Sequence, residues 1–315
     1  MTQLKRIDTR NMSREEWLEL RRKSIGGSDA AGIIDLSSYS SPYSIWANKT
    51  GRLPDAEDNE SMRIGRDLET YVAERWEEAT GKTVRRNNAL LINSQYPFAH
   101  ADIDRVVLGE KAGLECKTTS TLNIKQFHGI DFPEKYYVQC VHYLAVTGYD
   151  RWYLAVLVLG KGFYTFTLER NEDEINALMK AEKEFWDLVE SDTPPSLDGL
   201  DCTSEALQSI YKESRNTEIT LYGRENLLKN YLNLKNEKRV LDEKISVIEN
   251  TIKAEMQDSE YGSCGDYSIS WKSQSRQLFQ PKKFAKQHPE IDLQPFYKSS
   301  TARPFKVTEK KQEVM

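Results

Sequence analysis

The chain has few cysteines and no long apolar run among its 315 residues. The four cysteines are Cys116, Cys140, Cys202 and Cys264, and no two of them form a C-x-x-C pair. Zinc ribbons and iron–sulfur clusters use closely spaced cysteines, so both are disfavoured. No apolar stretch approaches the ~20 residues of a membrane span, and residues 1–17 lack the apolar segment of a signal peptide. We therefore expect a cytoplasmic protein with reduced thiols.

An excess of positive charge is also lacking. Lysine and arginine number 44 against 49 acidic residues, which gives a net charge of −5. This balance argues against a protein that binds nucleic acid by bulk charge, but it allows an enzyme with a local basic groove. A composition with 38% hydrophobic and 30% charged residues is typical of a soluble globular protein.

The pattern of apolar residues predicts an α/β (α+β) fold, in which a mixed central sheet is flanked by helices. We expect helices over residues 13–23, 61–80, 134–147 and 172–191, and strands over residues 98–107, 114–118, 151–159 and 162–168. Ser13 with Glu16 forms a capping-box pattern at the first helix. Gly81 is expected to end the second helix.

The best linker in the chain is rich in proline and acidic residues, at 192–203. We divide the chain into a main domain (1–195), a linker (196–221), a long helix (222–258) and a small α+β appendage (259–315). In the long helix Leu227, Tyr231, Leu234, Leu241, Ile245, Ile248 and Ile252 follow a 4-3-7-4-3-4 spacing, with Lys238 in one core position. This spacing favours a coiled coil, within the chain or between chains. The appendage is expected to contain strands at 266–272 and 303–307 and a helix at 282–287. Its basic residues fit either a solvated face or a DNA contact.

A hairpin near the middle of the main domain carries the first candidate site. Glu115 and Lys117 are two residues apart, so on a strand they point to the same face, and a twisted hairpin can bring Asp104 beside them. Carboxylate oxygens suit Mg²⁺, and a nearby lysine can orient water or neutralise developing charge. An ordinary exposed hairpin with a surface Glu–Lys pair explains the same residues.

A second candidate lies where residues 24–29, Ser-Ile-Gly-Gly-Ser-Asp, open a short helix. Unpaired N–H groups at such a helix start form an anion site, which Arg21 and Arg22 could complete. A glycine turn with a Ser28 or Asp29 cap is the plain alternative. Glu69 lies beside the apolar stripe of helix 61–80 and points either to solvent or into the site.

Six short motifs occur in one order along residues 13–190. They are Trp17-x-x-x-Arg21, residues 24–30 (SIGGSDA), Gly65-x-x-x-Glu69, residues 101–105 (ADIDR), residues 114–118 (LECKT) and Gln139-x-x-x-Tyr143-Leu144. Together they resemble the YqaJ-type viral recombinases, which are related to lambda exonuclease and belong to the PD-(D/E)xK nuclease superfamily. The resemblance implies a core like that of restriction endonucleases.

The resemblance also implies roles for individual residues. The metal ligands would be Asp104, Glu115 and the backbone carbonyl of Cys116, with Lys117 as the catalytic lysine and Glu69 as a further acid of the site. Arg21 and Ser28 would hold a DNA 5′ phosphate, and Gln139 would line that pocket.

Two positions depart from the family pattern. Ile103 replaces the motif's proline, which is tolerable because the chemistry belongs to the aspartate. Asp102 stands where lambda exonuclease has a small polar residue of the phosphate pocket. Asp102 shares a strand face with Asp104 and is therefore the reserve candidate for the metal ligand.

The implied activity is a Mg²⁺-dependent, or Mn²⁺-dependent, 5′→3′ exonuclease on linear double-stranded DNA, encoded by a phage or prophage. Its 3′ overhangs would pass to a single-strand annealing protein of the RecT/Beta type, and a ring-shaped homo-oligomer such as a trimer would encircle the DNA. One alternative is an endonuclease of the same superfamily, of restriction or junction type. A second is a non-catalytic module that binds DNA ends or mediates assembly. The cysteine spacing disfavours a Cas4-like iron–sulfur nuclease.

Overall fold

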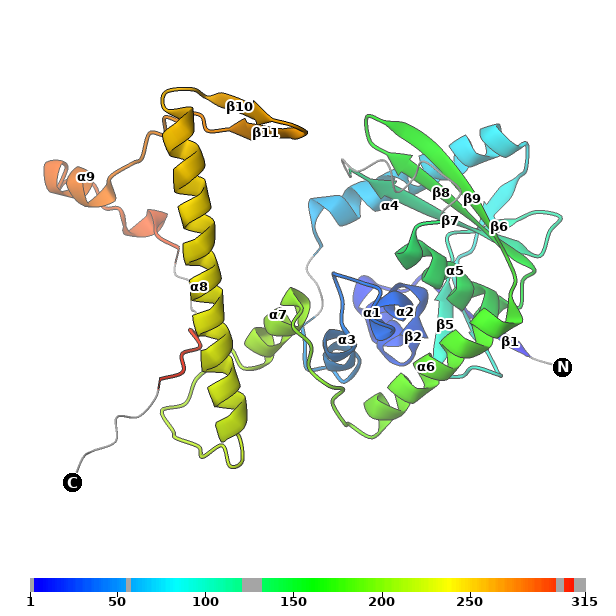
Figure 1. Cartoon of the computed structure of the whole chain (residues 1–315). Coiled ribbons are helices and arrows are strands. Elements are labelled where there is room, and N and C mark those ends of the chain that lie inside the picture. Colours follow the sequence, from blue (N-terminus) through cyan, green and yellow to red (C-terminus); the bar gives the residue numbers. More distant parts are fainter. Residues whose placement is uncertain (1–2, 55–57, 121–131, 299–302, 309–315) are drawn as a thin grey trace. The chain divides into compact units, whose positions relative to one another are not determined.

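The computed structural model of the chain describes residues 3–54, 58–120, 132–298 and 303–308 (Figure 1). The chain divides into two compact units, Met1–Lys212 and Glu213–Met315, each considered by itself. The first unit holds two sheets and seven of the described helices. The described residues contain no helix that is both long and apolar enough to cross a membrane.

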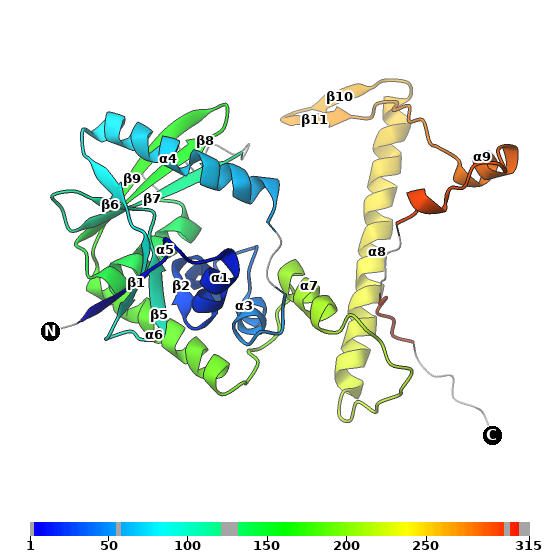
Figure 2. The same ribbon diagram turned by 180° about the vertical axis from the view of Figure 1, so that it is seen from behind.

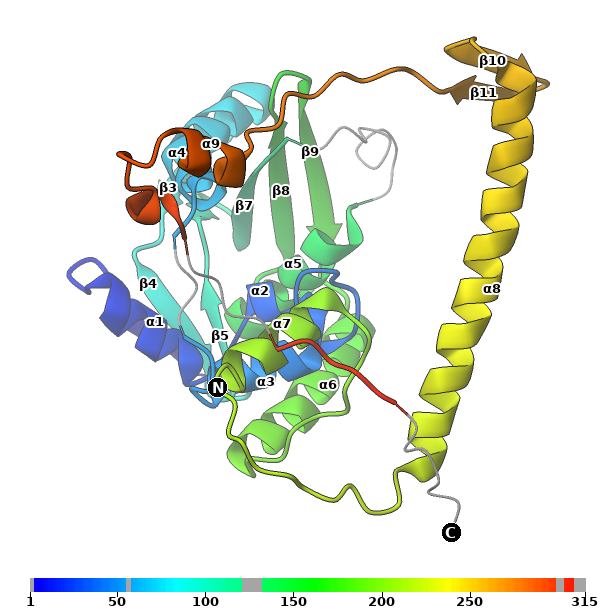
Figure 3. The same ribbon diagram turned by 90° about the vertical axis from the view of Figure 1, so that its left-hand side faces the viewer.

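A five-stranded mixed sheet forms the centre of the first unit. Its strands run in the order β3 (Val84–Arg86), β6 (Arg105–Val107), β7 (Ala112–Thr119), β8 (Arg151–Val158) and β9 (Gly162–Glu169). The pair β7–β8 is parallel and the other three pairs are antiparallel. Figure 3 shows β7, β8 and β9 side by side. The predicted mixed sheet flanked by helices is thus confirmed.

A second, four-stranded sheet was not expected. Its order is β1 (Leu4–Asp8), β4 (Ala89–Asn93), β5 (Ala99–Asp102) and β2 (Ile25–Gly26), and only β5–β2 is parallel. Figure 2 shows the N-terminal end of the chain leading into β1. The prediction of one strand over 98–107 is wrong, because β5 ends at Asp102 and β6 begins at Arg105 in the other sheet. Asp102 and Asp104 therefore lie on either side of a break between two sheets.

Two helices cover the five-stranded sheet, α4 (Glu60–Thr80) on one face and α5 (Glu134–Thr147) on the other. The other helices of the first unit are α1 (Arg14–Arg22), α2 (Gly27–Ile33), α3 (Pro42–Lys49), α6 (Glu172–Glu190) and α7 (Asp201–Ile210). Trp76 of α4 packs with Leu114 and Tyr153 on one face. Leu154 and Val156 point to the opposite face, where Tyr136 of α5 contacts them. Successive side chains of β7 consequently alternate between an α4 side and an α5 side of the sheet.

The helix ends follow the expected local chemistry. The side chain of Ser13 accepts from the N–H of Glu16, and Glu16 bonds back to the N–H of Ser13, so the capping box is confirmed. Gly81 ends α4 in the left-handed conformation with φ +70°. Residues 201–210, part of the predicted linker, form α7 instead. Thr203 of α7 is buried and its hydroxyl lies 2.6 Å from that of Ser41.

The second unit consists of the predicted long helix and smaller elements. Its elements are α8 (Glu225–Met256), β10 (Tyr261–Cys264), β11 (Tyr267–Ser270), α9 (Pro281–Gln287) and a 3₁₀ turn (Gln294–Phe296). The prediction of a strand over 303–307 is wrong, because residues 303–308 have no regular structure. Residues 309–315 of the predicted appendage lie outside the described ranges.

Candidate functional site

Glu115 and Lys117 project from β7 toward α5. Glu115 pairs in register with Leu154 and Lys117 with Val156, which places both on the α5 side of the sheet. The Lys117 Nζ lies 2.6 Å from Oε1 of Glu115. The Glu115 side chain is 3% exposed and that of Lys117 is 26% exposed, so the ammonium is the member of the pair that reaches solvent. The predicted common face is confirmed.

Asp104 joins this pair from the break before β6. Its Oδ2 accepts a hydrogen bond of 2.8 Å from the N–H of Cys116, the residue between Glu115 and Lys117. The hairpin of β6 and β7 provides this contact, because Arg105 lies opposite Leu114 in the register. The three residues predicted from the hairpin motif are therefore brought together.

The electrostatics show how crowded the acids are. Burial, together with the charges of Glu115 and Glu69, raises the pKa of Asp104 well above its usual value. Burial also raises the pKa of Glu115, against the opposing charge of Lys117. Burial opposes protonation of Lys117, but the two carboxylates outweigh it and raise the pKa of Lys117 above its ordinary value. Lys117 is consequently an ammonium at neutral pH.

Glu69 contacts the site from α4. Its Oε1 is ion-paired with Nη1 of Arg105, whose side chain is only 6% exposed. Arg105 also donates to the hydroxyl of Thr70 at 3.3 Å. Glu69 still acts on both Asp104 and Glu115 electrostatically. The sequence left open whether Glu69 points to solvent or into the site. In the structure its side chain is directed toward the site.

Asp102 is held by an aromatic donor. The indole Nε1 of Trp17 donates to its Oδ2 at 3.0 Å, and the hydroxyl of Tyr143 donates to its backbone carbonyl at 3.1 Å. Burial raises the pKa of Asp102, while Arg21 opposes that rise. Asp102 in turn raises the pKa of Glu115, so the reserve candidate lies near the carboxylate cluster.

Gln139 lies against the carboxylates. Its Nε2 donates to Oε1 of Glu115 at 2.8 Å and to the hydroxyl of Tyr143 at 2.9 Å. The resemblance had implied that Gln139 lines a phosphate pocket. The structure places it between α2 and the carboxylates, because Gly27 is so close that a Cβ there would lie 3.2 Å from its Cγ.

Most residues of the predicted anion site lie together at the start of α2. Nη2 of Arg21 donates to Oγ of Ser28 at 2.9 Å, and its guanidinium lies 4.4 Å above the ring of Trp17. Lys49 lies 2.7 Å from Asp29, whose Oδ2 also accepts from the N–H of Gly26 at 2.9 Å. The glycine turn with an aspartate cap and the arginine–serine pair thus coexist.

Several neighbours of the site were not predicted as site residues. Trp17 and Tyr143 stood in the matched motifs, and that was the available signal for them. Arg105 stood in the matched residues 101–105 as well, but its pairing with Glu69 had no signal, and neither had Lys49, because the partners are far apart in sequence. Glu69 and Asp29 are partly exposed, and each neutralises a cation that is itself nearly buried.

The donor set suits a divalent cation. Oε2 of Glu115 is buried without a hydrogen-bond partner, and Asp104 carries the hard oxygens that Mg²⁺ prefers. Across the residues that the structure describes, no group of three or more His, Cys, Asp or Glu side chains is arranged to hold a metal. Mg²⁺ needs only one or two carboxylates and keeps several waters, so the pair fits it.

Comparison with known proteins places the chain in a family. Residues 16–150 match the model of the YqaJ-like viral recombinase domain. The uncharacterized protein YqaJ of Bacillus subtilis (strain 168) is 41% identical over 287 residues, which cover 89% of this chain and 90% of that protein. Among solved structures, an alkaline exonuclease (LHK-Exo) from Laribacter hongkongensis has 20% identity and a TM-score of 0.49 over 57% of this chain and 94% of its own. A phage-related exonuclease from Haemophilus somnus 129PT has 14% identity and a TM-score of 0.42 over 56% and 99%. At 41% identity over nearly the whole length of both proteins, the chain belongs to the YqaJ-like viral recombinase family.

Proposed function

We propose that the chain is a metal-dependent deoxyribonuclease that degrades linear double-stranded DNA from its 5′ ends. The observation that carries the proposal is the convergence of Asp104, Glu115 and Lys117 at the hairpin, with one oxygen of Glu115 left without a partner. Membership of a family of viral recombinases supports it.

Asp104, Glu115 and the backbone carbonyl of Cys116 would hold the metal. A bound Mg²⁺ or Mn²⁺ supplies Lewis acidity toward the scissile phosphate and lowers the pKa of a coordinated water. Gln139 and Lys117 both bind Oε1 of Glu115, which leaves Oε2 as the oxygen available to the cation. Glu69 would act as a further acid at the rim, oriented by Arg105.

Lys117 has a defined part in this arrangement. Because the neighbouring carboxylates keep its pKa high, Lys117 carries a proton at neutral pH. It would therefore orient the attacking water by hydrogen bonding and neutralise charge that develops on the phosphate. Removal of a proton from the water falls to another acceptor.

Polarity would come from the pocket at the start of α2. Arg21 and Ser28 are already joined at 2.9 Å, and the turn at Gly26–Gly27 lies against Gln139 and Tyr143, the residues that border Glu115. A terminal 5′ phosphate held by Arg21 and Ser28 would restrict cutting to DNA ends. The proposed product is duplex with 3′ single-stranded overhangs, passed to a single-strand annealing protein. A ring-shaped homo-oligomer would keep the enzyme on the strand.

The test is digestion of end-labelled linear duplex with Mg²⁺, with and without a 5′ phosphate. We expect wild type to release nucleotides from the 5′ strand, Lys117→Ala to lose at least ~10²-fold in rate, and Lys180→Ala on exposed α6 to match wild type. Equal rates for wild type and Lys117→Ala would remove the lysine from the mechanism. Intact linear duplex after incubation with wild type would refute the exonuclease.

The rival activities give different results in the same assay. An endonuclease of the superfamily cuts covalently closed circular DNA, which an exonuclease leaves intact. A non-catalytic end-binding module retains DNA in EDTA and hydrolyses nothing in Mg²⁺ or Mn²⁺. The buried pairing of acids with one lysine favours the enzyme, because a binding module gains nothing from acids whose pKa values are raised by burial.

A further inference from the structure

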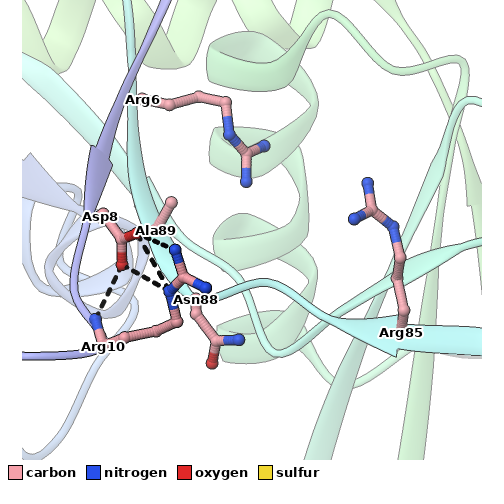
Figure 4. A pocket seen from close by; sticks show the side chains of 6 residues that line it. All are labelled: Arg6, Asp8, Arg10, Arg85, Asn88 and Ala89. Carbon is pink, nitrogen blue, oxygen red and sulfur yellow. Dashed lines mark hydrogen bonds and ion pairs between the residues drawn. The ribbon is translucent and has the colours of Figure 1, made fainter.

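A hollow of about 390 Å³ on the first unit is lined by arginines that the proposed chemistry does not use. The lining residues are Arg6, Asp8, Arg10, Arg85, Asn88 and Ala89, contributed by β1, β3, β4 and the adjoining loops. Figure 4 shows the guanidinium groups of Arg6 and Arg85 on either side of the open space, with Arg10 folded onto Asp8.

The charge of this hollow is positive in a chain that is negative overall. Arg10 donates from its backbone N–H and from Nε to Asp8 at 3.0 Å. The single acid of the hollow is therefore already paired with one of the three arginines. Arg6 donates to the neutral side chain of Asn87 at 3.0 Å. Within the described part of the chain no salt bridge involves Arg6 or Arg85. The charge of Arg6 also acts on Asp8, but the hollow holds three arginines against this one acid and therefore keeps an excess of positive charge.

The hollow lies next to the carboxylate cluster. Asn87, which accepts from Arg6, donates its backbone N–H to the carbonyl of Asp104 at 3.4 Å. Arg86, between Arg85 and Asn87, lowers the pKa of Asp102. The hollow and the carboxylate cluster are thus neighbours, so a polyanion bound at the cluster can continue toward the hollow.

We propose that Arg6 and Arg85 bind a backbone phosphate of DNA beside the catalytic site. The inference rests on the proposed function, since it takes the DNA in that site as its ligand. A guanidinium presents a planar fork of N–H donors that matches phosphate oxygens, and a contact to phosphate adds affinity without reading sequence.

The experiment measures the affinity of labelled linear duplex for full-length protein in EDTA, over a series of salt concentrations. Each phosphate contact contributes about 0.9 to the slope of log affinity against log salt. We expect the double variant Arg6→Ala/Arg85→Ala to bind about 10-fold more weakly and to lose about 0.9 of that slope, the share of one phosphate contact. The variant with lysine at both positions should keep the salt slope of wild type. Arg63→Ala, at an exposed position of α4, should have the affinity and slope of wild type.

Failure of the inference and failure of the proposed function give different results. Wild type that digests linear duplex, with an alanine variant of unchanged affinity and slope, overturns the phosphate site alone. Wild type that neither binds nor digests DNA overturns both. A weaker alanine variant whose slope equals that of wild type also overturns the site, because a structural disturbance lowers affinity without removing a released counterion.

A second inference comes independently from α8. The residues at core positions of α8 fall into two rows at heptad spacing. One row consists of Leu227, Leu234, Leu241 and Ile248. The other consists of Tyr231, Ile245 and Ile252, with Lys238 as its one charged member. No residue of α8 is buried, and Leu234, Leu241, Ile245 and Ile248 are each between 54% and 60% exposed. Phe305 contacts Tyr231 near the start of the stripe. A long stripe of this kind is expected to have a helical partner.

The charged positions indicate which partner fits. A parallel pair of identical helices would place Lys238 against Lys238 in the core and Asp242 beside Glu237 of the other copy. An antiparallel pair places Lys238 opposite Leu241, and its flanks align Lys235 with Asp242 and Glu237 with Lys244, all of opposite sign. A parallel pair would also set Lys244 beside Glu249, which attract, but it would still place two Lys238 side chains together. The charges of the central heptads therefore favour helices that run in opposite directions.

We infer that α8 pairs with α8 of a second copy in antiparallel orientation, centred between Lys238 and Leu241. The test is sedimentation equilibrium of the full-length chain. Leu241→Asp, in the stripe, should dissociate the pair, whereas Val247→Asp, outside it, should not. Asp242→Lys should raise the dissociation constant at least about fivefold, since it turns two attractive flank pairs into repulsive ones. Adding Lys235→Glu should restore association.

The same charge reversal separates the two orientations. In a parallel pair Asp242→Lys would relieve the repulsion from Glu237 and strengthen association. A lowered or unchanged dissociation constant for Asp242→Lys therefore overturns the inference, as does an assembly that Leu241→Asp leaves intact.

Discussion

Neutralising Asp29 tests whether the turn that opens α2 depends on a charged anchor beneath it. Burial alone would raise the pKa of Asp29, but the charges of Lys49 and Arg21 and the N–H of Gly26 lower it from 3.8 to about 2. Since one pKa unit is worth about 1.4 kcal/mol, ionised Asp29 stabilises the fold by about 2 kcal/mol at neutral pH. Its side chain is 22% exposed and that of Lys49 is 4% exposed, so solvent screens the pair little. Asp29→Asn should lower the free energy of unfolding by at least this amount.

The pH dependence of this effect follows from the lowered pKa. Because the folded-state pKa lies below the unfolded value of 3.8, the stabilisation is complete above that value and is lost as the pH falls toward 2. Urea unfolding is followed by tryptophan fluorescence, since Trp17, Trp46, Trp76, Trp152 and Trp186 all lie in the first unit. The difference between wild type and Asp29→Asn should be full at pH 7 and reduced by about half at pH 3.

An exposed aspartate supplies the matched control. Asp67→Asn on α4 makes the same chemical change where the side chain is 69% exposed, and it should alter stability by less than ~0.5 kcal/mol. A difference between wild type and Asp29→Asn that is the same at pH 7 and pH 3 would show that the ion pair is not its source. A variant as stable as wild type at pH 7 would refute the anchor altogether.

Packing and metal dependence give the remaining predictions. Gly113→Ala should destabilise the first unit by about 1–3 kcal/mol, because a Cβ there would lie 2.3 Å from the Trp152 ring. Gly65→Ala, where a Cβ has open space, should be neutral or stabilising by up to ~1 kcal/mol. Equal urea midpoints for Gly113→Ala and Gly65→Ala would contradict this difference between the two glycines. Leu154→Ala, at a fully buried position, should cost about 2–5 kcal/mol in the same unfolding assay. EDTA should abolish digestion without changing the far-ultraviolet circular dichroism, and digestion that persists in EDTA would exclude the proposed metal.

The sequence predicted those parts of the fold that local chemistry determines. The hairpin before β7 follows from turn residues such as Gly109, which adopts φ +82°, and α4 ends at Gly81 for the same reason. The predicted strand at 303–307 failed because Pro304 cannot donate to a ladder and so disfavours pairing there. β1 was missed because it is a five-residue strand at the sheet edge and carries only Leu4 and Ile7 as apolar residues.

The site was predictable where its residues lie within one strand, hairpin or turn. Glu115 and Lys117 share a face because they are two apart on one strand. The contact of Gln139 with Glu115 depends on how α5 packs over β7, and the pairing of Arg105 with Glu69 depends on α4. Such contacts depend on the packing of elements far apart in the chain, which periodicity does not specify.

A second buried acid clarifies what distinguishes the candidate site. Glu182 is fully buried, bonds to His142 at 2.8 Å and, like Glu115, has one oxygen without a partner. Its protein partner is a single imidazole on the neighbouring α5, so burial with one orphaned oxygen also occurs in a helix–helix contact. Glu115 differs because Glu69 and Asp102 add like charge beside it and because the paired Lys117 reaches solvent. Acids crowded together in this way, with an opening to solvent, favour a bound cation, and the proposed divalent metal would be that cation.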